Sequence, residues 1–193
     1  MTSQEGYLRA GSFDKRRLAE LYRQYAYLTG EFQLSSGMTS NYYINSKTVT
    51  LLPEGAYLIA RGILDKIEGE KVDAIGGAAL GAAPISGALA VLCFLEKEFN
   101  NMVLFVDRKK AKKYGDQKRL EGPDINPGSR VVIVDDVATT GGSSLEVARE
   151  LKNNGCEIVK VVSLLDRKMG AGEMFEKEGI PFEALLTVED LDN

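Results

Sequence analysis

The chain has 193 residues, of which 44% are hydrophobic and 27% charged, and its formal net charge is −4. These values are typical of a globular protein with a full hydrophobic core, so we expect residues 1–193 to form a single domain. The acidic balance argues against a nucleic-acid partner. Because the chain contains no histidine, imidazole catalysis and His-ligated metals are excluded.

Two further features bear on location. No stretch approaches the roughly 18 consecutive apolar residues of a transmembrane helix, and the first residues lack the apolar core of a signal peptide. We therefore expect a cytoplasmic protein with no membrane partner.

Cys93 and Cys156 lie far apart in apolar surroundings, which indicates reduced core residues rather than a disulfide.

The first 50 residues or so predict an N-terminal helix and a small hood. Residues 14–28 carry apolar residues at helical spacing after Asp14, which is suited to capping. Residues 31–47 (EFQLSSGMTSNYYINSK) alternate and turn at Ser36 and Gly37, which favours a β-hairpin or an irregular hood. A helix is then predicted over 53–68, with a proline in its first turn.

From residue 72 onward, apolar strands alternate with helices. Strands are predicted at 72–77, 102–107, 130–136, 157–166 and 181–188, and helices at 83–99 and 144–154. Strands this uniformly apolar are buried on both faces. The pattern therefore predicts an α/β fold with a mostly parallel central sheet flanked by helices.

The stretch VVIVDDVATTGGSS (131–144) contains the main candidate site. Ligands of open parallel sheets bind at the carboxyl ends of the strands, where Asp135 and Asp136 are expected. The turn 139–143 leads into a helix, whose free N–H groups and dipole favour an anion. Carboxylates accept hydrogen bonds from ribose hydroxyls and hold the water shell of Mg²⁺, so a phosphorylated ribose suits both parts. The alternative is a plain strand end followed by a helix cap at Ser143.

Residues 107–122 form a long polar connection between two predicted core strands. Seven cations face a single anion, Asp116, between residues 108 and 119: Arg108, Lys109, Lys110, Lys112, Lys113, Lys118 and Arg119. Such a connection is usually functional or disordered. A mobile cationic loop can close over an anionic ligand and stabilise negative charge that develops on it. The alternative is an ordinary solvated charge run.

VVIVDDVATTGGS resembles the phosphoribosyl-pyrophosphate (PRPP) signature of the type I phosphoribosyltransferases. The resemblance implies that residues 139–143 hold the 5′-phosphate and that the two acids face the ribose hydroxyls, with Mg²⁺ held by PRPP and water near them and not ligated directly by protein. The implied PRPP-binding residues of this motif are Asp135, Asp136, Val137, Ala138, Thr139, Thr140, Gly141, Gly142 and Ser143.

The stretch RKKAKKYG…EG resembles the mobile catalytic loop of orotate phosphoribosyltransferase. This implies that Arg108, Lys109, Lys112 and Tyr114 bind PRPP, and that Lys112 is catalytic together with Asp135 and Asp136. Many family members have histidine where this chain has Tyr114. Tyrosine can donate a hydrogen bond but cannot shuttle a proton near neutral pH. In this family the loop closes over the neighbouring subunit, which implies a homodimer.

Two other stretches indicate the base. FQLSSGMTSNYYINSK resembles the hood of the orotate enzymes, and VVSLLDRKMGA resembles the strand and turn that carry their orotate-contacting arginine. Arg167 would pair bidentately with the orotate carboxylate, and Thr139 is the second implied orotate contact. The alternative for Arg167 is a surface arginine. The chain departs from the family at Ser35, where lysine is common, and at Leu80 and Gly81, where a Tyr-Lys pair is common.

The predicted function is transfer of the 5-phosphoribosyl group from PRPP to orotate, giving orotidine 5′-monophosphate (OMP) and pyrophosphate in pyrimidine nucleotide biosynthesis. One alternative is a phosphoribosyltransferase for another base, such as a purine. The other is a PRPP-sensing regulator of the same fold that binds nucleic acid. The regulator is disfavoured because the chain is acidic, keeps the cationic loop and has no appended helix-turn-helix.

Overall fold

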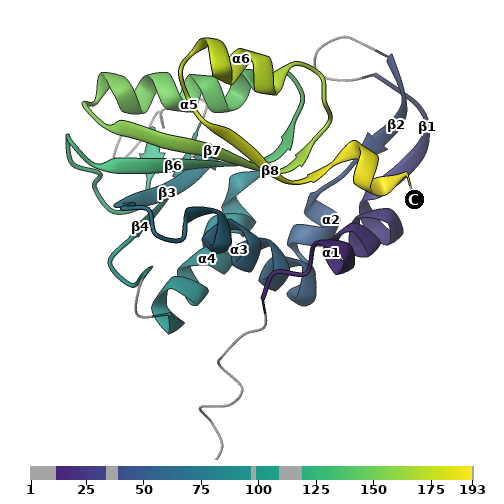
Figure 1. Cartoon of the computed structure of the whole chain (residues 1–193), viewed down its shortest axis with the longest axis horizontal. Helices are drawn as coiled ribbons and strands as arrows, with labels where there is room; N and C mark the ends of the chain where they lie inside the picture. Colours follow the sequence, from purple (N-terminus) through teal and green to yellow (C-terminus); the bar gives the residue numbers. More distant parts are fainter. Residues whose placement is uncertain (1–11, 34–38, 97–98, 109–118, 193) are drawn as a thin grey trace, which may run out of the picture.

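The computed structural model describes residues 12–33, 39–96, 99–108 and 119–192. It contains a six-stranded sheet in the order β5-β4-β3-β6-β7-β8 and a separate antiparallel hairpin (Figure 1). The hairpin strands are β1 (Tyr27–Gln33) and β2 (Thr39–Ile44). The sheet strands are β3 (Ala74–Ala78), β4 (Val103–Asp107), β5 (Leu120–Glu121), β6 (Arg130–Ala138), β7 (Glu157–Asp166) and β8 (Phe182–Thr187).

The helices cover both faces of the sheet. They are α1 (Lys15–Leu21), which continues as a π-helical segment (Tyr22–Ala26), α2 (Lys47–Thr50), α3 (Pro53–Ile67), α4 (Ala82–Leu95), α5 (Gly142–Asn153), α6 (Ala171–Lys177) and a 3₁₀ turn (Val188–Leu191). In Figure 1, α5 and α6 lie on one side of the sheet and α1 to α4 on the other. No helix in the described ranges is long and apolar enough to cross a membrane.

Pairing along the sheet confirms the predicted α/β architecture. β3 pairs in parallel with β4 and β6, β6 with β7, and β7 with β8, while β5 pairs antiparallel with β4. Parallel strands need crossover helices, which α4, α5 and α6 provide. The sheet is therefore mostly parallel, with one short antiparallel edge strand.

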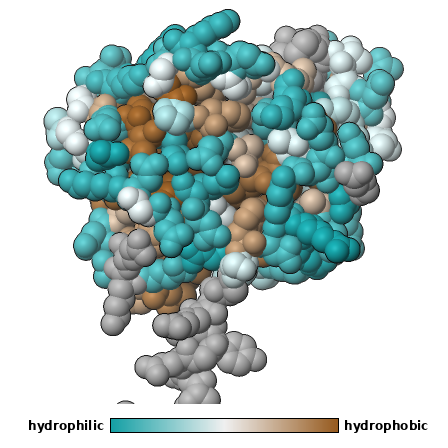
Figure 2. Space-filling view, in the orientation of Figure 1, coloured by the Kyte–Doolittle hydropathy of each residue, from teal (hydrophilic) through white to brown (hydrophobic). Residues whose placement is uncertain are grey.

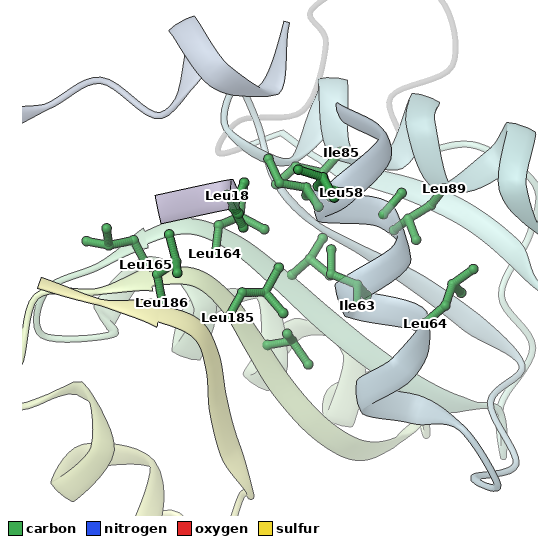
Figure 3. Packing of buried hydrophobic residues seen from close by; sticks show 14 of the residues in the cluster. Leu18, Leu58, Ile63, Leu64, Ile85, Leu89, Leu164, Leu165, Leu185 and Leu186 are labelled. Atoms are coloured by element: carbon green, nitrogen blue, oxygen red, sulfur yellow. The ribbon is translucent and has the colours of Figure 1, made fainter. Parts of the chain in front are cut away.

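The alternation of side chains along β6 divides the core into two layers. Val132 and Val134 face the cluster formed with α3 and α4, whereas Val131 and Ile133 face the cluster formed with α5 and α6. This double burial explains the uninterrupted apolar run of the strand. Figure 3 shows the first layer, in which aliphatic residues of α3 and α4 pack against leucines of β7 and β8. In Figure 2 most of the visible surface is hydrophilic.

Element boundaries differ from the predictions in several places. The first helix gives way to β1 at Tyr27, and the helix expected to start at Ser144 starts at Gly142. β6 continues to Ala138 because its pairing with β7 runs on to Asp166. Asp135 and Asp136 therefore lie inside the strand, not at its last residue as expected. Both cysteines are buried and free, as predicted.

The predicted hairpin is confirmed over its two strands. β1 and β2 pair antiparallel from Tyr27 opposite Ile44 to Gln33 opposite Thr39, with one irregularity in register. The expected turn at Ser36 and Gly37, together with Ser35, lies outside the described residues.

Candidate functional site

Polar side chains from four parts of the chain meet in an open cleft of about 410 Å³ at the carboxyl ends of β6 and β7. This is the edge at which ligands of open α/β sheets bind. The cleft is lined by Gln33, Tyr43, Ile44, Lys47, Asp135, Asp136, Val137, Thr139, Gly141, Gly142, Ser143 and Arg167.

Asp135 and Asp136 both line the cleft but have different partners, because successive strand residues point to opposite faces. Asp135 Oδ2 accepts a 2.6 Å hydrogen bond from Ser144 Oγ at the start of α5. Asp136 Oδ2 lies 3.1 Å from Lys47 Nζ of α2, and its Oδ1 accepts a hydrogen bond from the Val137 N–H. The two carboxylates are thus separately oriented.

The turn between β3 and α4 passes directly beside Asp136. A Cβ added at Gly81 would collide with the Asp136 carboxylate, so the close approach requires glycine there. The Asp136 carboxylate occupies the space that a larger side chain at residue 81 would need. Leu80 is exposed and does not line the cleft.

The turn after β6, residues 139–143, has the geometry of an anion site and is called the anion turn below. Gly141 has a φ of +78°, and a Cβ at this position would collide with Met174 and Phe175 of α6. Gly142 and Ser143 then open the 12-residue helix α5, whose first N–H groups have no partner within the helix. These free donors and the helix dipole favour an anion in the cleft.

Two members of the predicted motif do not face the cleft. Ala138 is buried in the core, and its N–H donates a hydrogen bond to Ser163 Oγ. Thr140 is exposed and is not a lining residue. Thr139 does line the cleft, beside Arg167.

Arg167 follows β7 and is only 6% exposed, so the alternative of an exposed surface arginine is wrong. Its N–H donates to the Ala138 carbonyl at 2.9 Å, which fixes it beside the anion turn. Its guanidinium reaches the hairpin, where Nη2 donates to Ser40 Oγ at 2.9 Å and the guanidinium carbon lies 4.4 Å from the centre of the Tyr42 ring.

Sequence reasoning missed Lys47 and the side chains of the hairpin. Lys47 reaches the cleft because the single-turn helix α2 docks on β6, where Ser46 Oγ donates to the Asp136 carbonyl at 3.3 Å. Ser46 in turn accepts a hydrogen bond from the buried Tyr22 hydroxyl, and burial raises the pKa of Tyr22. A single lysine in a four-residue helix carries no periodic signal.

The structure describes only part of the cationic segment, residues 107–122. Lys109, Lys112 and Tyr114 lie outside the described residues, so their roles stay predictions. At its start, Arg108 Nε lies 3.0 Å from Glu121, and the residue is not part of the cleft lining. At its end, Arg119 forms a two-pronged ion pair with the buried Asp107, and this hydrogen bonding raises the pKa of Arg119.

Comparisons with known proteins identify the family of this chain. The model of the phosphoribosyl transferase domain family matches residues 48–178, which include both acids, the anion turn and Arg167. The orotate phosphoribosyltransferase of Synechocystis sp. is 40% identical over 177 residues, covering 92% of this chain and 88% of the relative. That of Rhodopseudomonas palustris (strain TIE-1) is 39% identical, covering 94% of this chain and 98% of the relative.

Solved structures show the same similarity. The orotate phosphoribosyltransferase of Mycobacterium tuberculosis H37Rv in complex with PRPP has a TM-score of 0.75 and 30% identity, over 93% of this chain and 99% of that one. The same protein in complex with Fe(III) dicitrate has a TM-score of 0.79 and 33% identity, again over 93% of this chain and 99% of that one.

Proposed function

This chain belongs to the phosphoribosyl transferase family, and within it to the orotate phosphoribosyltransferases, and from that premise we propose how its cleft carries out the reaction. The reaction joins the phosphoribosyl group of PRPP to orotate and releases pyrophosphate, in pyrimidine nucleotide biosynthesis. The observation that carries the proposal is the meeting of two oriented carboxylates, an anion turn and a buried arginine in one cleft.

The cleft binds PRPP through its 5′-phosphate and through its ribose hydroxyls. The free N–H groups at the start of α5, with Thr139 and Ser143, bind the 5′-phosphate. Asp135 and Asp136 accept hydrogen bonds from the ribose hydroxyls. Lys47 beside Asp136 offsets part of the negative charge that the acids place next to an anionic ligand.

Orotate lies between the anion turn and the hairpin. Arg167 pairs with its carboxylate, and Thr139 lies on the same side of the cleft. The ring nitrogen of orotate forms a bond to the anomeric carbon while the bond to the pyrophosphate oxygen breaks, through an oxocarbenium-like state with inversion. The bonding electrons leave with pyrophosphate, and the proton lost from the ring nitrogen ends on the released pyrophosphate.

Stabilisation of the leaving group is assigned to the cationic segment. Arg108, Lys109 and Lys112 contact the pyrophosphate, with Lys112 the main catalytic cation, and Tyr114 also binds PRPP. The segment closes over the neighbouring subunit of a homodimer. Positioning and electrostatics then supply most of the rate enhancement, so neither a histidine nor a covalent nucleophile is required.

Mg²⁺ fits this cleft as an ion brought in by PRPP. The described residues contain no group of three or more acidic or thiol side chains that could hold a metal, whereas two oriented carboxylates suit an ion that keeps most of its water. When bound, it offsets charge on the pyrophosphate. Asp135 and Asp136 would hold its water shell. We place this chain, as one domain, in the cytoplasm.

A base panel tests the proposal. The protein is incubated with PRPP and Mg²⁺ and, separately, with orotate, uracil, adenine and hypoxanthine, and the nucleotide is detected by chromatography. We expect OMP from orotate and no nucleotide from the other bases. Product from a purine and none from orotate would overturn the assignment of the base. Binding of DNA or RNA in a gel-shift assay, without formation of any nucleotide product from PRPP, would favour a regulator.

A further inference from the structure

The inward face of β2 carries two side chains that hold Arg167. Ser40 and Tyr42 are two residues apart, so they project from the same face of the strand, and both contact the guanidinium. Arg167 lies 127 and 125 residues further along the chain. A hairpin remote in sequence therefore holds the residue assigned to the substrate carboxylate.

Ser40 presents its oxygen to Arg167 as a fixed acceptor. Its hydroxyl donates to the Tyr42 carbonyl at 2.8 Å, so the proton is directed along the strand. Ser40 Oγ then accepts a 2.9 Å hydrogen bond from Arg167 Nη2. The Tyr42 N–H also donates to Ser40 Oγ, at 3.4 Å, so one lone pair is used within the strand and the other accepts from the guanidinium.

Tyr42 supplies a flat surface for the same guanidinium. The distance of 4.4 Å between the guanidinium carbon and the ring centroid is within the range of a cation–π interaction. Arg167 Nε also donates to the Tyr42 hydroxyl at 3.4 Å. The Tyr42 ring is itself stacked on Tyr27, with centroids 5.3 Å apart and planes inclined by 15°, so its position is fixed by the hairpin.

The remaining hydrogen-bonding capacity of Arg167 matches a carboxylate. A guanidinium has five N–H groups, and Ser40 and Tyr42 use one on Nη2 and the one on Nε. Within the described residues, both Nη1–H groups and the second Nη2–H group have no hydrogen-bond partner. One Nη1–H and the second Nη2–H form the end-on edge of the guanidinium, which can bind a carboxylate bidentately.

We propose that Ser40 and Tyr42 are specificity-determining positioning residues, which hold Arg167 so that this edge faces the carboxylate of the base. The proposal rests on the proposed function and extends it. A long arginine side chain that is already ordered loses less freedom when the ligand binds, so affinity is gained specifically for a ligand with a carboxylate at that place.

The test compares two nucleotides that differ only in this carboxylate, OMP and uridine 5′-monophosphate (UMP). Their dissociation constants are measured by calorimetry for the unaltered protein and for Ser40→Ala and Tyr42→Leu. We expect each substitution to weaken OMP binding about tenfold, because Ser40→Ala removes a charge-assisted hydrogen bond and Tyr42→Leu removes a cation–π contact. UMP binding should stay within about twofold of that of the unaltered protein.

Conservative variants separate this role from support of the hairpin. Tyr42→Phe keeps the ring and Ser40→Thr keeps the hydroxyl, so both should retain most of the preference for OMP. Asn41→Ala, on the opposite exposed face of β2, should behave as the unaltered protein. If Tyr42→Leu does not fold, Ser40→Ala carries the test alone.

Equal weakening of OMP and UMP would show that the two residues only support the fold of the hairpin, and unchanged OMP binding would show that Arg167 needs neither; either result overturns the proposal. Failure of the proposed function is seen separately, because the unaltered protein would then form no OMP from orotate and PRPP.

Discussion

Lys47 and Asp136 form an ion pair inside the cleft, with Lys47 Nζ 3.1 Å from Asp136 Oδ2. The pair joins the one-turn helix α2 to the acidic end of β6, and the lysine cation lets two carboxylates lie beside an anion site. One of the two negative charges is offset by a cation that is itself part of the cleft lining.

Replacing Lys47 by methionine should therefore weaken PRPP binding. Loss of the cation leaves the cleft more negative, and the KM for PRPP should rise about tenfold for a partly exposed pair of this kind, with a smaller change in kcat. Steady-state kinetics measure this, and Lys47→Arg should restore most of the loss. An unchanged KM for PRPP would mean that the pair has no role in binding.

Lys112→Ala tests the cation assigned to the leaving group. Charge builds up on pyrophosphate mainly in the transition state, so kcat should fall by about 100-fold or more while the dissociation constant of PRPP changes only a few-fold. Single-turnover kinetics and calorimetry give the two numbers. Equal losses in both would make Lys112 a simple binding residue.

Mixing two inactive variants tests whether the cationic segment acts across a dimer. In a mixture of Lys112→Ala and Asp136→Asn, each mixed dimer contains one site with both native residues and one site with neither. About half of the dimers are mixed after random reassociation, so up to about a quarter of the activity of the unaltered protein should return. The mixture is dissociated and reassociated before assay. Activity no higher than that of the separate variants would contradict a shared site.

The sequence predicted the sheet and the glycine turn after β6 well because both have dense local signals. β6 is apolar on both faces, and Gly141 and Gly142 follow it where a strand must turn into a helix. Local patterns could not predict that β6 runs past Asp136, since that depends on pairing with β7. The contact of Arg167 with Tyr42 spans 125 residues and has no local signature at all.

Gly141→Ala should destabilise the protein. Alanine is strained at a φ of +78°, and its Cβ would collide with Met174 and Phe175, so we expect a loss of about 1–3 kcal/mol in the free energy of unfolding. Gly142→Ala is the matched control, because the nearest atom to its added Cβ lies 3.9 Å away. Urea denaturation of both variants gives the comparison, and equal stability would contradict the geometry of the turn.

Glu183 should contribute a pH-dependent part of the stability. Burial raises the pKa of Glu183, but hydrogen bonds from Lys66 and Lys160 outweigh it and hold the pKa below its usual value. A carboxyl group whose pKa is lower in the folded state stabilises that state above the unfolded pKa, about 4.3, and this contribution is lost as the pH falls through the folded pKa.

Glu183→Gln should accordingly be less stable than the unaltered protein at pH 7, and the difference should shrink as the pH is lowered from about 5 toward 3. Chemical denaturation across this range measures it. Glu176→Gln, at an exposed position on α6, should follow the unaltered protein throughout. A difference that grows toward low pH would have the wrong sign for this account.

The most direct measurement is a crystal structure of the protein with PRPP and Mg²⁺ bound. The account predicts the 5′-phosphate on the N–H groups of residues 139–143, with the ribose hydroxyls against Asp135 and Asp136. A sugar phosphate bound elsewhere, with both aspartates turned away from it, would contradict the account.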